Sequence, residues 1–546
     1  MPEGANQPPP YEDRNLYLSD RPLQEAAARE GAGWAHDELS RWGERMGSAA
    51  MLALAARANR FAPELRTHDR FGERIDEVAF DPAWHELMAA AMHAGEHCRP
   101  WVEPRPGAQV ARAAAYLLHA EVENGTQCPL TMTYAAVPVL RRHAEAMPAL
   151  GELWLPRVLG REYDSRPLPI AAKRSALIGM GMTERQGGSD VRANITRAEK
   201  TADGSYRLSG HKWFFSAPMC DAHLVLAQAG GGPTCFLLPR MLPDRTRNAV
   251  RLVRLKDKLG NRSNASSEVE FERAQAWLLG EEGRGVPVII EMVQHTRLDC
   301  AIGSAGIVRG ATARALHHAA YRRAFGKLLV DQPLMRNVLA DLVLEAEAST
   351  ALALRLARAF EADAPESEKA LARLATPAIK FWVCKRAPTV LAEAMEVLGG
   401  NGYVEDSDLP RFYREAPLNS IWEGSGNVMC LDVLRAASRE PQAVESFLAE
   451  LDLARGGDAR LDRHAVKLAA ALRERSLDER DGRRIAGSIA VALAAAILLR
   501  HAPRAIADAY CASRLGDADA SGLGTLPAEA DLAAIIETRL DRSLAS

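Results

Sequence analysis

The chain has 546 residues, of which 47% are hydrophobic and 25% charged, with 68 Lys+Arg against 71 Asp+Glu and a formal net charge of −3. This composition excludes an intrinsically disordered chain, a collagen-like fibre and a small disulfide scaffold. It also excludes a bulk polycation, so any binding of nucleic acid would have to come from a local basic patch. At roughly 150 residues per domain, the length predicts about three or four domains.

The cysteines indicate a reducing compartment, and the apolar segments indicate a protein that is neither exported nor inserted in a membrane. No two of the eight cysteines form a CxxC pair, which favours reduced, buried thiols. The first residues, MPEGANQPPPYEDR, contain neither a basic nor an apolar leader region, so no export signal is visible. The longest apolar run, residues 485–499, is shorter than the about 20 residues that span a bilayer, and its alanines favour a packed helix. We therefore expect a cytoplasmic protein that does not enter a membrane.

Metal and nucleotide-hydrolysis motifs receive little support. His93 and His97 lie four residues apart beside Cys98, but no further cluster of ligands follows, so no metal site is predicted. No G-x-x-x-x-G-K-[ST] loop is found, and no G-x-G-x-x-G opens a βαβ unit. Nucleotide hydrolysis and NAD chemistry therefore have no basis in the sequence.

The first half of the chain predicts an arm, a helical domain and a β domain. Residues 1–35 are polar and Pro-rich, and predict an arm that lies on the body or on a neighbouring subunit. Residues 36–175 place apolar side chains at three- and four-residue spacing, which indicates helices. Residues 176–280 contain Gly-rich turns and period-two runs (SYRLSGHKWFF, HLVLAQA, TCFLLP, VRLVRL, SEVEFE), with an Asp-Gly hairpin signal in TADGSY.

The second half predicts helices only. Residues 281–440 contain long periodic segments separated by Gly and Pro, which suits a bundle of antiparallel helices. Residues 441–546 form a further helical block. The fold class is therefore α+β: an N-terminal helical domain, a middle β-barrel or β-sandwich domain, a C-terminal four-helix bundle and an extra C-terminal α-helical domain.

Three stretches carry candidate chemistry. The first, GMGMTERQGGSDVRANITRA at 179–198, offers hydroxyls and free backbone N–H groups to an anionic or hydrogen-bonding ligand, although such loops are commonly only turns. In the second, SGHKWFFSAP at 209–218, an aromatic ring could stack on a planar cofactor while Ser216 bonds its edge; a strand with aromatic core residues is the alternative.

The third stretch, residues 396–435, contains Glu423 between apolar or small neighbours in IWEGSGN. An apolar surrounding raises the pKa of a carboxylate, as a general base that works near neutral pH requires. A partnered core carboxylate is the alternative interpretation.

In order and spacing, these stretches resemble the acyl-CoA dehydrogenase family of flavoproteins over about residues 40–440. MTERQGGSDV resembles the family's first flavin loop and GHKWFFS its second, with Ser216 in the place of the hydroxyl that contacts flavin N5. Phe214 stands where the family usually has Trp. YRRAFGKLL resembles the segment that reaches the FAD of a neighbouring subunit, EVLGGNGY the dinucleotide-contacting turn, and IWEGSGN the base motif.

The resemblance implies bound FAD. The residues implied to contact it are Met182, Thr183, Gly188, Ser189, Phe214, Phe215, Ser216, Arg322, Phe325, Gly399, Gly400, Trp422, Gly424, Ser425 and Asn427. Two of the family's positions are altered. Glu396 replaces the usual Gln and would have to face away from the pyrophosphate or be neutralised by an Arg, and Trp422 replaces the usual Tyr.

The resemblance further implies that Glu423 is the catalytic base. Some members place the base on an earlier helix, but the matching position here is Thr296, which cannot act as one. Glu423 would remove the α-proton of an acyl thioester while the β-hydrogen passes as hydride to the flavin. Hydrogen bonds to the thioester carbonyl would stabilise the enolate-like charge.

Several phrases, among them RLKDKLGNRSNAS and LPRFYREAPLNSIWEGSGNVMCLDVLR, are similar to a branch of the family that acts in the bacterial response to DNA alkylation damage. That resemblance implies a homotetramer, a C-terminal domain that binds double-stranded DNA, and weak acyl-CoA dehydrogenase activity of the isovaleryl-CoA type. A metabolic acyl-CoA dehydrogenase without DNA binding, and a non-catalytic FAD-containing scaffold associated with DNA, are the alternatives.

The charges of the extension leave DNA binding open. Residues 455–500 hold ten basic and six acidic residues, whereas residues 441–546 as a whole hold 14 and 16. A helix face with several Arg residues could follow phosphates, but a solvated helix surface with internal ion pairs would read the same way. The predicted DNA contacts are Arg435, Arg473, Arg475, Arg483 and Arg484.

Overall fold

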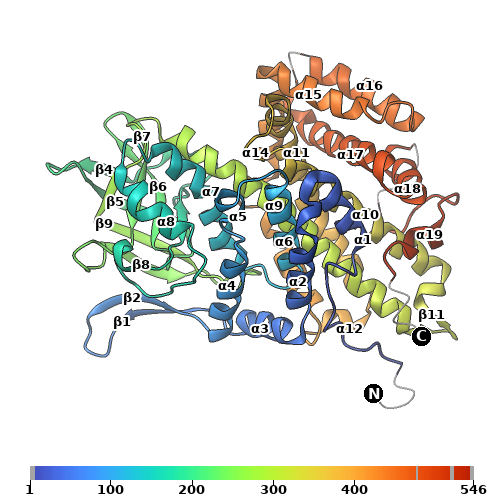
Figure 1. Cartoon of the computed structure of the whole chain (residues 1–546), viewed down its shortest axis with the longest axis horizontal. Coiled ribbons are helices and arrows are strands. Elements are labelled where there is room, and N and C mark those ends of the chain that lie inside the picture. The colour runs from blue at the N-terminus through green and yellow to red at the C-terminus, as the bar shows by residue number, and fades with distance from the viewer. Residues whose placement is uncertain (1–5, 475–476, 517–521, 541–546) are drawn as a thin grey trace. The chain divides into compact units, whose positions relative to one another are not determined.

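The computed structural model describes residues 6–474, 477–516 and 522–540 (Figure 1). The chain divides into two units. The first comprises Met1–Leu52, Arg105–Val122 and Arg297–Ser546, and the second comprises Ala53–Pro104 and Glu123–Thr296. Neither unit is one continuous stretch, so the five predicted segments do not correspond to them one to one, and their boundaries stay a prediction.

A seven-stranded sheet in the second unit closes on itself. The strand order is β3-β6-β4-β5-β9-β7, and because β6 also pairs with β7, the five strands from β6 to β7 form a ring of pairings, with β8 added on β9. This is the predicted middle β domain, in its barrel form. The strands are β3 (Ile178–Gly181), β4 (Arg197–Lys200), β5 (Tyr206–Ser216), β6 (Ala222–Ala229), β7 (Gly232–Pro239), β8 (Val250–Leu255) and β9 (Ser266–Leu278).

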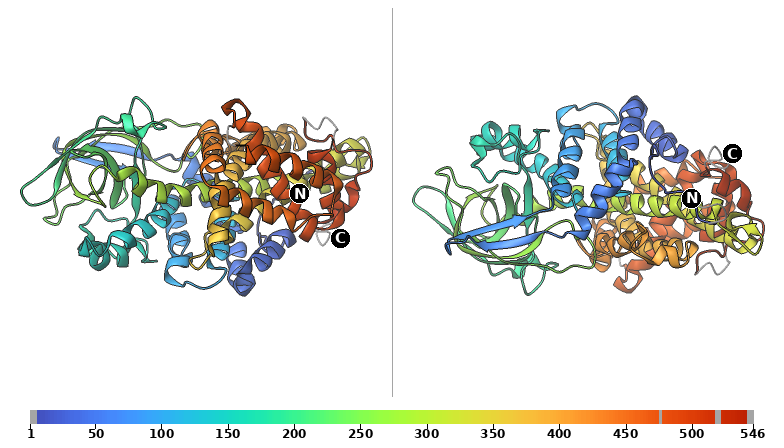
Figure 2. Two further views of the ribbon diagram at one scale, coloured as in Figure 1. Left: turned by 90° about the horizontal axis from the view of Figure 1, so that it is seen from above. Right: turned by 90° about the horizontal axis from the view of Figure 1, so that it is seen from below.

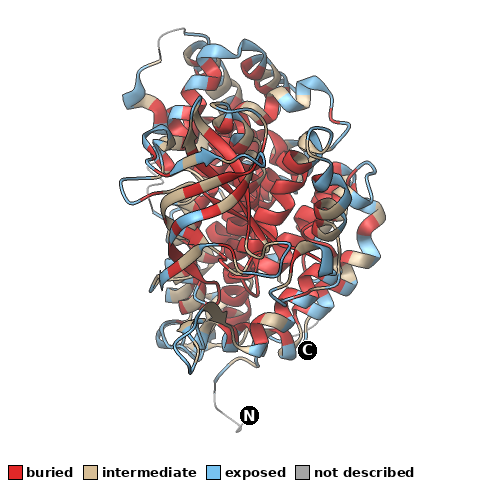
Figure 3. Cartoon of the chain, turned by 90° about the vertical axis from the view of Figure 1, so that its left-hand side faces the viewer, coloured by how far each residue is buried: buried red, intermediate tan, exposed pale blue. Residues whose placement is uncertain are grey.

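The period-two runs are the strands that the sequence predicts. TADGSY connects β4 to β5 as an antiparallel hairpin in which Lys200 pairs with Tyr206, and the carboxylate of Asp203 accepts from the hydroxyl of Thr201 at 2.5 Å. Apolar residues of β5 to β9 form the core of the sheet, including Leu208, Phe236 and Val269. In Figure 3 buried residues follow the strands and the inner faces of helices, and exposed residues follow loops.

The rest of the second unit is helical apart from one hairpin. Strands β1 (Glu64–His68) and β2 (Arg74–Ala79) pair antiparallel inside the stretch that the sequence predicts to be helical. Both are largely polar, so they show no apolar alternation that would reveal a strand. The helices are α3 (Ala49–Arg60), α4 (Pro82–Ala94), α5 (Arg99–Val102), α7 (Gln127–His143) and α8 (Leu155–Val158).

The first unit is a helical bundle that includes the C-terminal extension. Helix α11 contacts α10, α14, α15 and α17, and α17 also contacts α10 and α14, so the extension packs directly on the bundle (Figure 2). The bundle helices are α2 (His36–Met46), α6 (Ala108–Ala120), α9 (Gly285–Tyr321, which belongs to this unit from Arg297 onward), α10 (Pro333–Arg358), α11 (Glu366–Val397), α12 (Gly400–Tyr403), α13 (Leu409–Glu415) and α14 (Gly426–Arg439). The extension contributes α15 (Pro441–Asp452), α16 (Ala459–Arg473), α17 (Gly482–His501), α18 (Arg504–Leu515) and α19 (Leu532–Glu537), and strands β10 (Arg323–Ala324) and β11 (Lys327–Leu328) form a short hairpin.

The predicted N-terminal arm is partly helical. Helix α1 (Arg21–Ala27) begins inside it, capped by the Asp20 carboxylate, which accepts from the backbone N–H of Leu23 at 3.0 Å, and it packs against α10. Ahead of this helix, the Asn6 side chain donates to the backbone oxygen of Arg323 at 2.9 Å. The described part of the arm therefore lies on the bundle of its own chain.

The long apolar run is a core helix. Among the described residues, one helical stretch, Glu479–His501, has the length and composition of a membrane span, but 78% of its most apolar window is buried inside the protein. Burial of this extent matches the predicted packed helix. All eight cysteines are also buried and outside any disulfide, as expected for reduced thiols.

Candidate active site

The loop after β3, residues 182–189, is held by a buried ion pair. The ammonium of Lys212 on β5 lies 2.8 Å from a carboxylate oxygen of Glu184, and both side chains are 0% exposed. Lys212 also donates to the backbone oxygens of Leu226 at 2.7 Å and Met182 at 3.3 Å. Burial alone would raise the pKa of Glu184, but Lys212 and further hydrogen bonds hold that pKa at about 2. The Glu184 carboxylate therefore stays ionised, and its buried pair with Lys212 fixes the first flavin-like loop.

The same loop presents small polar groups to its surroundings. The backbone N–H of Trp213 donates to the carbonyl of Thr183 at 2.9 Å, which ties the loop to β5. A Cβ atom at Gly188 would lie 2.4 Å from the hydroxyl oxygen of Thr183, so a larger residue there would displace the Thr183 side chain. Ser189 is exposed. Thr183, Gly188 and Ser189 are therefore close in space and carry the hydroxyls and amides that an anionic or polar ligand requires.

Strand β5 separates its aromatic residues between two environments. The Phe214 side chain is 52% exposed, whereas Phe215 is 2% exposed within the sheet core. The pairing of β5 with β9 shifts register between Lys212 and Phe215. This irregularity reverses the direction of the side chains. Phe214 thus remains a candidate for stacking. The ring of Phe215, implied above to contact FAD, instead belongs to the core.

Glu423 lies in a strained turn whose backbone is held by two cations. Its φ is 58° and that of Gly424 is 100°, both in the left-handed region that non-glycine residues rarely adopt. Lys380 on α11 donates to the carbonyls of Trp422 at 2.8 Å and Gly424 at 2.5 Å, and Arg297 on α9 donates to the carbonyl of Glu423 at 3.0 Å. Three successive carbonyls are therefore fixed, and a strained conformation can persist at a functional site when its surroundings determine it in this way.

Side chains around this turn form further hydrogen bonds. The Trp422 indole N–H donates to the Asn419 side chain at 2.9 Å, and Asn419 in turn donates to the Ser304 hydroxyl at 3.1 Å. Arg297 forms an ion pair with Asp432 of α14 at 2.8 Å. The turn is thus connected to α9, α11 and α14 at once, and Trp422 has a fixed orientation beside Glu423.

Helix α14 connects the turn to the extension. Ser425 occupies the N-cap position of α14 without a side-chain cap. The Asn427 side-chain oxygen accepts from Arg483 of α17 at 2.8 Å. A predicted flavin contact and a predicted DNA contact therefore bind each other. An Arg483 that is used in this way is less available to a phosphate.

The remaining implied FAD contacts lie at the surface of the first unit. Arg322 donates to the backbone oxygen of Asn6 at 2.5 Å, and Phe325, at the tip of the β10–β11 hairpin, is 97% exposed. Gly399 and Gly400 would have open space around an added Cβ. Glu396 is exposed. Open glycine backbone and a bare aromatic ring are features that a large planar cofactor could cover.

Thr296, at the alternative base position, donates its hydroxyl to the carbonyl of Val293 at 3.0 Å. A hydroxyl in that position supplies no base, so Glu423 stays the predicted base.

Most predicted DNA contacts are involved in local ion pairs. Arg473 pairs with Glu445 at 3.0 Å, Arg484 with Asp481 at 3.1 Å, and Arg435 lies 3.8 Å from Asp432. Arg475 lies outside the described residues. Arg463 and Lys467 of α16, by contrast, are exposed, and the structure gives neither an ion pair within the described ranges. These two are the better candidates for phosphate contact, which the count of charges alone did not reveal.

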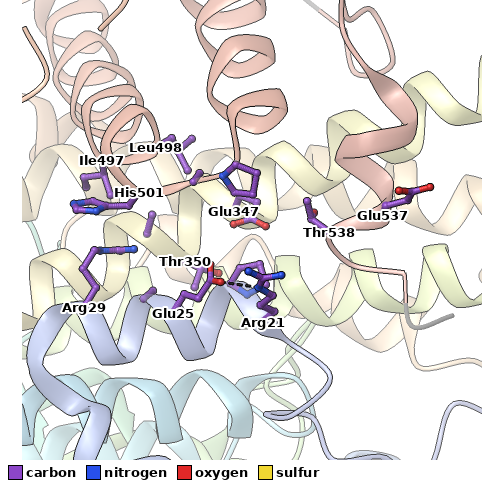
Figure 4. Close-up of a pocket in the computed structure, with 15 residues that line it drawn as sticks. Arg21, Glu25, Arg29, Glu347, Thr350, Ile497, Leu498, His501, Glu537 and Thr538 are labelled. Atoms are coloured by element: carbon purple, nitrogen blue, oxygen red, sulfur yellow. Dashed lines mark hydrogen bonds and ion pairs between the residues drawn. The ribbon is translucent and has the colours of Figure 1, made fainter. Parts of the chain in front are cut away.

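A pocket of about 140 Å³ lies elsewhere in the first unit, between α1, α10, α17 and α19. Figure 4 shows Arg29 beside His501 and the ion pair of Arg21 with Glu25, which spans 2.6 Å. Its lining contains none of the residues of the three motifs. Its charged groups are largely engaged with protein partners, so it is not the candidate site.

The two histidines near Cys98 differ, since His97 is buried and His93 is exposed. The Nε2 atom of His97 lies 3.0 Å from the carbonyl oxygen of Gly160. Across residues 6–474, 477–516 and 522–540 no group of three or more His, Cys, Asp or Glu side chains could hold a metal ion.

Three family models match successive parts of the chain. The N-terminal domain of the adaptive response protein AidB matches residues 6–165, the middle domain of acyl-CoA dehydrogenases matches residues 179–274, and their C-terminal domain matches residues 283–438. The matched segments follow the order helices, sheet, helices described above.

Similar proteins agree with these models. The chain is 52% identical over 507 residues to AidB of Escherichia coli (strain K12), a match that covers 93% of each protein. Acyl-CoA dehydrogenase ACDH-11 of Caenorhabditis elegans, solved in complex with C11-CoA, has a TM-score of 0.85 at 26% identity and covers 96% of this chain and 95% of that one. An acyl-CoA dehydrogenase of Bacillus anthracis, solved with FAD, shares the fold with a TM-score of 0.59 at 16% identity, covering 86% and 83%.

Proposed function

The chain belongs to the acyl-CoA dehydrogenase family, and from that premise we propose that it is an AidB-like flavoprotein in which Glu423 acts as the base. Members of this family are FAD-dependent oxidoreductases that act on CH–CH bonds. The observation that carries the proposal is the Glu423 turn, whose three successive carbonyls are held by Lys380 and Arg297. A carboxylate so positioned suits the removal of a proton from carbon, which requires exact placement more than mobility.

The residues present fit FAD. Thr183, Ser189 and Ser216 supply hydroxyls, the exposed ring of Phe214 offers a stacking face, and Gly399 begins a turn of open backbone. When bound, FAD supplies the acceptor for the β-hydrogen and its electron pair. The chain's own contribution is to hold Glu423 for the α-proton and to keep Trp422 fixed beside it.

Flavin content separates this proposal from a protein without redox function. The gently purified protein is expected to show flavin absorbance near about 450 nm and to bleach under anaerobic addition of isovaleryl-CoA, because the flavin accepts the electrons. A colourless protein that does not take up added FAD would contradict the proposal. Bound FAD that no acyl-CoA reduces would favour the non-catalytic scaffold instead.

We also propose that the extension binds double-stranded DNA, as part of a role in the response to alkylation damage. Two observations support this: the similarity to E. coli AidB covers 93% of the chain and so extends past residue 440, and Arg463 and Lys467 are exposed one helical turn apart on α16. Side chains at this spacing share a helix face and could follow a phosphate backbone.

Fluorescence anisotropy with a DNA duplex across a salt series tests this role. Each phosphate contact contributes roughly 0.9 to the slope of log affinity against log salt, so Arg463→Gln with Lys467→Gln should lower the slope by about 2. Arg480→Gln is the matched control, because Arg480 is engaged with Asp478 at 2.5 Å. Wild-type protein whose anisotropy stays flat would remove the DNA role and favour a purely metabolic enzyme.

We propose further that the protein is a cytoplasmic homotetramer. The almost fully exposed Phe325 on a hairpin tip supports assembly, since isolated aromatic rings of this kind commonly enter an interface. Light scattering after size exclusion should give four times the 59.4 kDa chain mass. A monomer at micromolar concentration would contradict this assembly.

A further inference from the structure

His223 of β6 lies directly behind the second flavin-like segment. Its ring is stacked on that of Phe215, with 3.8 Å between ring centroids and 22° between the planes. Its Nε2 lies 3.2 Å from the backbone oxygen of Ser216. The side chain is buried, and none of the chemistry considered so far uses it.

Strand β3 is shaped to admit these two rings. Gly179 is the register partner of His223, and a Cβ at Gly179 would lie 2.3 Å from the imidazole. A Cβ at Gly181 would lie 2.7 Å from the ring of Phe215. Contacts below 3.0 Å cannot be accommodated without movement, so both glycines leave room for the stacked pair. The stacked rings of His223 and Phe215 therefore depend on two glycines of the neighbouring strand, which is more than filling a core requires.

The imidazole is neutral in this position. Burial lowers the pKa of His223 to about 3, against the opposing effect of backbone hydrogen bonds to Ser216 and Ala217. A neutral ring that bonds a carbonyl through Nε2 carries its proton on that nitrogen and donates it. The bond is thus the same at any pH at which the protein works.

The backbone that the ring contacts is strained. Ala217, directly after Ser216, has a φ of 52°, a conformation that alanine rarely adopts. Its N–H donates to the carbonyl of Ala265 at 2.8 Å, so the chain is fixed on the side of β9 as well. Ser216 is consequently held at its carbonyl by His223 and at the next residue by Ala265.

We propose that His223 is a positioning residue for the flavin: by donating to the Ser216 carbonyl and supporting Phe215, it sets the direction in which Ser216 faces the reactive edge of FAD. This inference rests on the proposed function, because that function is what places FAD at Ser216. A histidine that only filled the core would affect stability and leave the bound flavin unchanged.

The test uses the full-length protein with FAD and compares His223→Phe, which keeps a stacking ring but loses the donor, with His223→Gln, which keeps a donor. Phe271→Leu is the matched control: Phe271 contacts the same Phe215 ring, with centroids 6.0 Å apart, and does not bond Ser216. The readouts are FAD affinity, the visible spectrum of bound flavin and the rate of sulfite addition, which reports on access to flavin N5. Thermal unfolding is followed in parallel.

His223→Phe should weaken FAD binding by about fivefold, as expected for one lost hydrogen bond, and should alter both the spectrum and the sulfite rate. His223→Gln should fall between this variant and wild type, and Phe271→Leu should match wild type in all three readouts. If His223→Phe does not fold, Gly179→Ala serves as the second variant, because it displaces the same ring and should change the same readouts.

Two results would overturn the inference. Wild-type flavin properties in a folded His223→Phe protein would show that the donor is not needed, and equal changes in Phe271→Leu would assign the effect to core packing. If the wild-type protein takes up no FAD, the proposed function itself is wrong, and so is the inference that rests on it. The two failures are therefore distinguishable.

Discussion

The loop at 182–189 and the turn at 421–425 are both held from inside by a buried lysine, but in different ways. Lys212 binds the Glu184 carboxylate and two carbonyls, so its charge is balanced within the loop it supports. In the described part of the chain, Lys380 has two partners, and both are backbone carbonyls of the turn that contains Glu423. The first loop uses its glutamate as an anchor, whereas the second is anchored through its backbone.

This difference explains why Glu184 and Glu423, two glutamates in similar motifs, have different roles. The Glu184 carboxylate accepts hydrogen bonds from the Lys212 ammonium and from the backbone N–H groups of Ile195 and Thr196. Its oxygens therefore serve to hold the structure. At the Glu423 turn, Lys380 and Arg297 bind carbonyls rather than the Glu423 carboxylate. A general base must reach the proton that it removes from substrate, and three fixed carbonyls set the position from which Glu423 does so.

Removing Lys212 should have the largest effect on stability. Lys212→Met leaves Glu184 buried without its cation, which typically costs about 3–5 kcal/mol of unfolding free energy. Urea denaturation at neutral pH measures this cost. The double variant with Glu184→Gln should recover much of it, because no charge is then buried alone. A loss below about 1 kcal/mol in the single variant would contradict the role given to the ion pair.

Removing Lys380 should cost less stability but affect catalysis more. Lys380→Met leaves two carbonyls without their donor, at about 1–2 kcal/mol each, so a total of about 2–4 kcal/mol is expected. Because the Glu423 turn loses two of its three anchors, reduction of bound flavin by acyl-CoA should slow while FAD remains bound. Lys385→Met, at an exposed position of the same helix, is the control and should change stability by less than about 0.5 kcal/mol. An unchanged rate of flavin reduction in Lys380→Met would contradict the role given to Lys380 in placing Glu423.

Another buried carboxylate, Glu347, sharpens the comparison because its cation is more distant than that of Glu184. Glu347 lies 3.4 Å from Arg539, and burial raises the pKa of Glu347 to about 7. The folded state therefore holds a proton that the unfolded chain releases near pH 4.5, so this group's contribution to stability declines as pH rises from 4.5 towards 7. Glu347→Gln should remove about 2 kcal/mol of that decline between pH 5 and pH 7. Unfolding curves at the two pH values provide the test, and equal declines in variant and wild type would contradict the assignment.

The strands and the motif positions could be predicted from the sequence because they depend on local patterns. Alternation revealed β5 to β9, and Asp-Gly revealed the β4–β5 hairpin. The direction of Phe215 could not be predicted, since a register shift in the pairing with β9 reverses it. Polar strands such as β1 leave no apolar alternation to detect.

The anchoring residues were missed for a different reason. Lys380 lies 42 residues from Trp422, and Arg297 lies 126 residues from Glu423. Tertiary contacts over such separations leave no periodic signal, and a lysine in a helical pattern normally indicates a solvated face. His223 was likewise part of an apparent apolar strand. What the sequence could supply was the chemistry of the motifs, and what only the structure supplies is the set of groups that fix them.

The most direct measurement is the anaerobic reduction of bound flavin by an acyl-CoA, with wild type and Glu423→Gln compared in rapid-mixing experiments. If Glu423 is the base, the variant should retain FAD with an unchanged spectrum and be reduced about 10²–10⁴-fold more slowly. Reduction of the Glu423→Gln flavin at the wild-type rate would contradict the central claim that this turn is built to place the base.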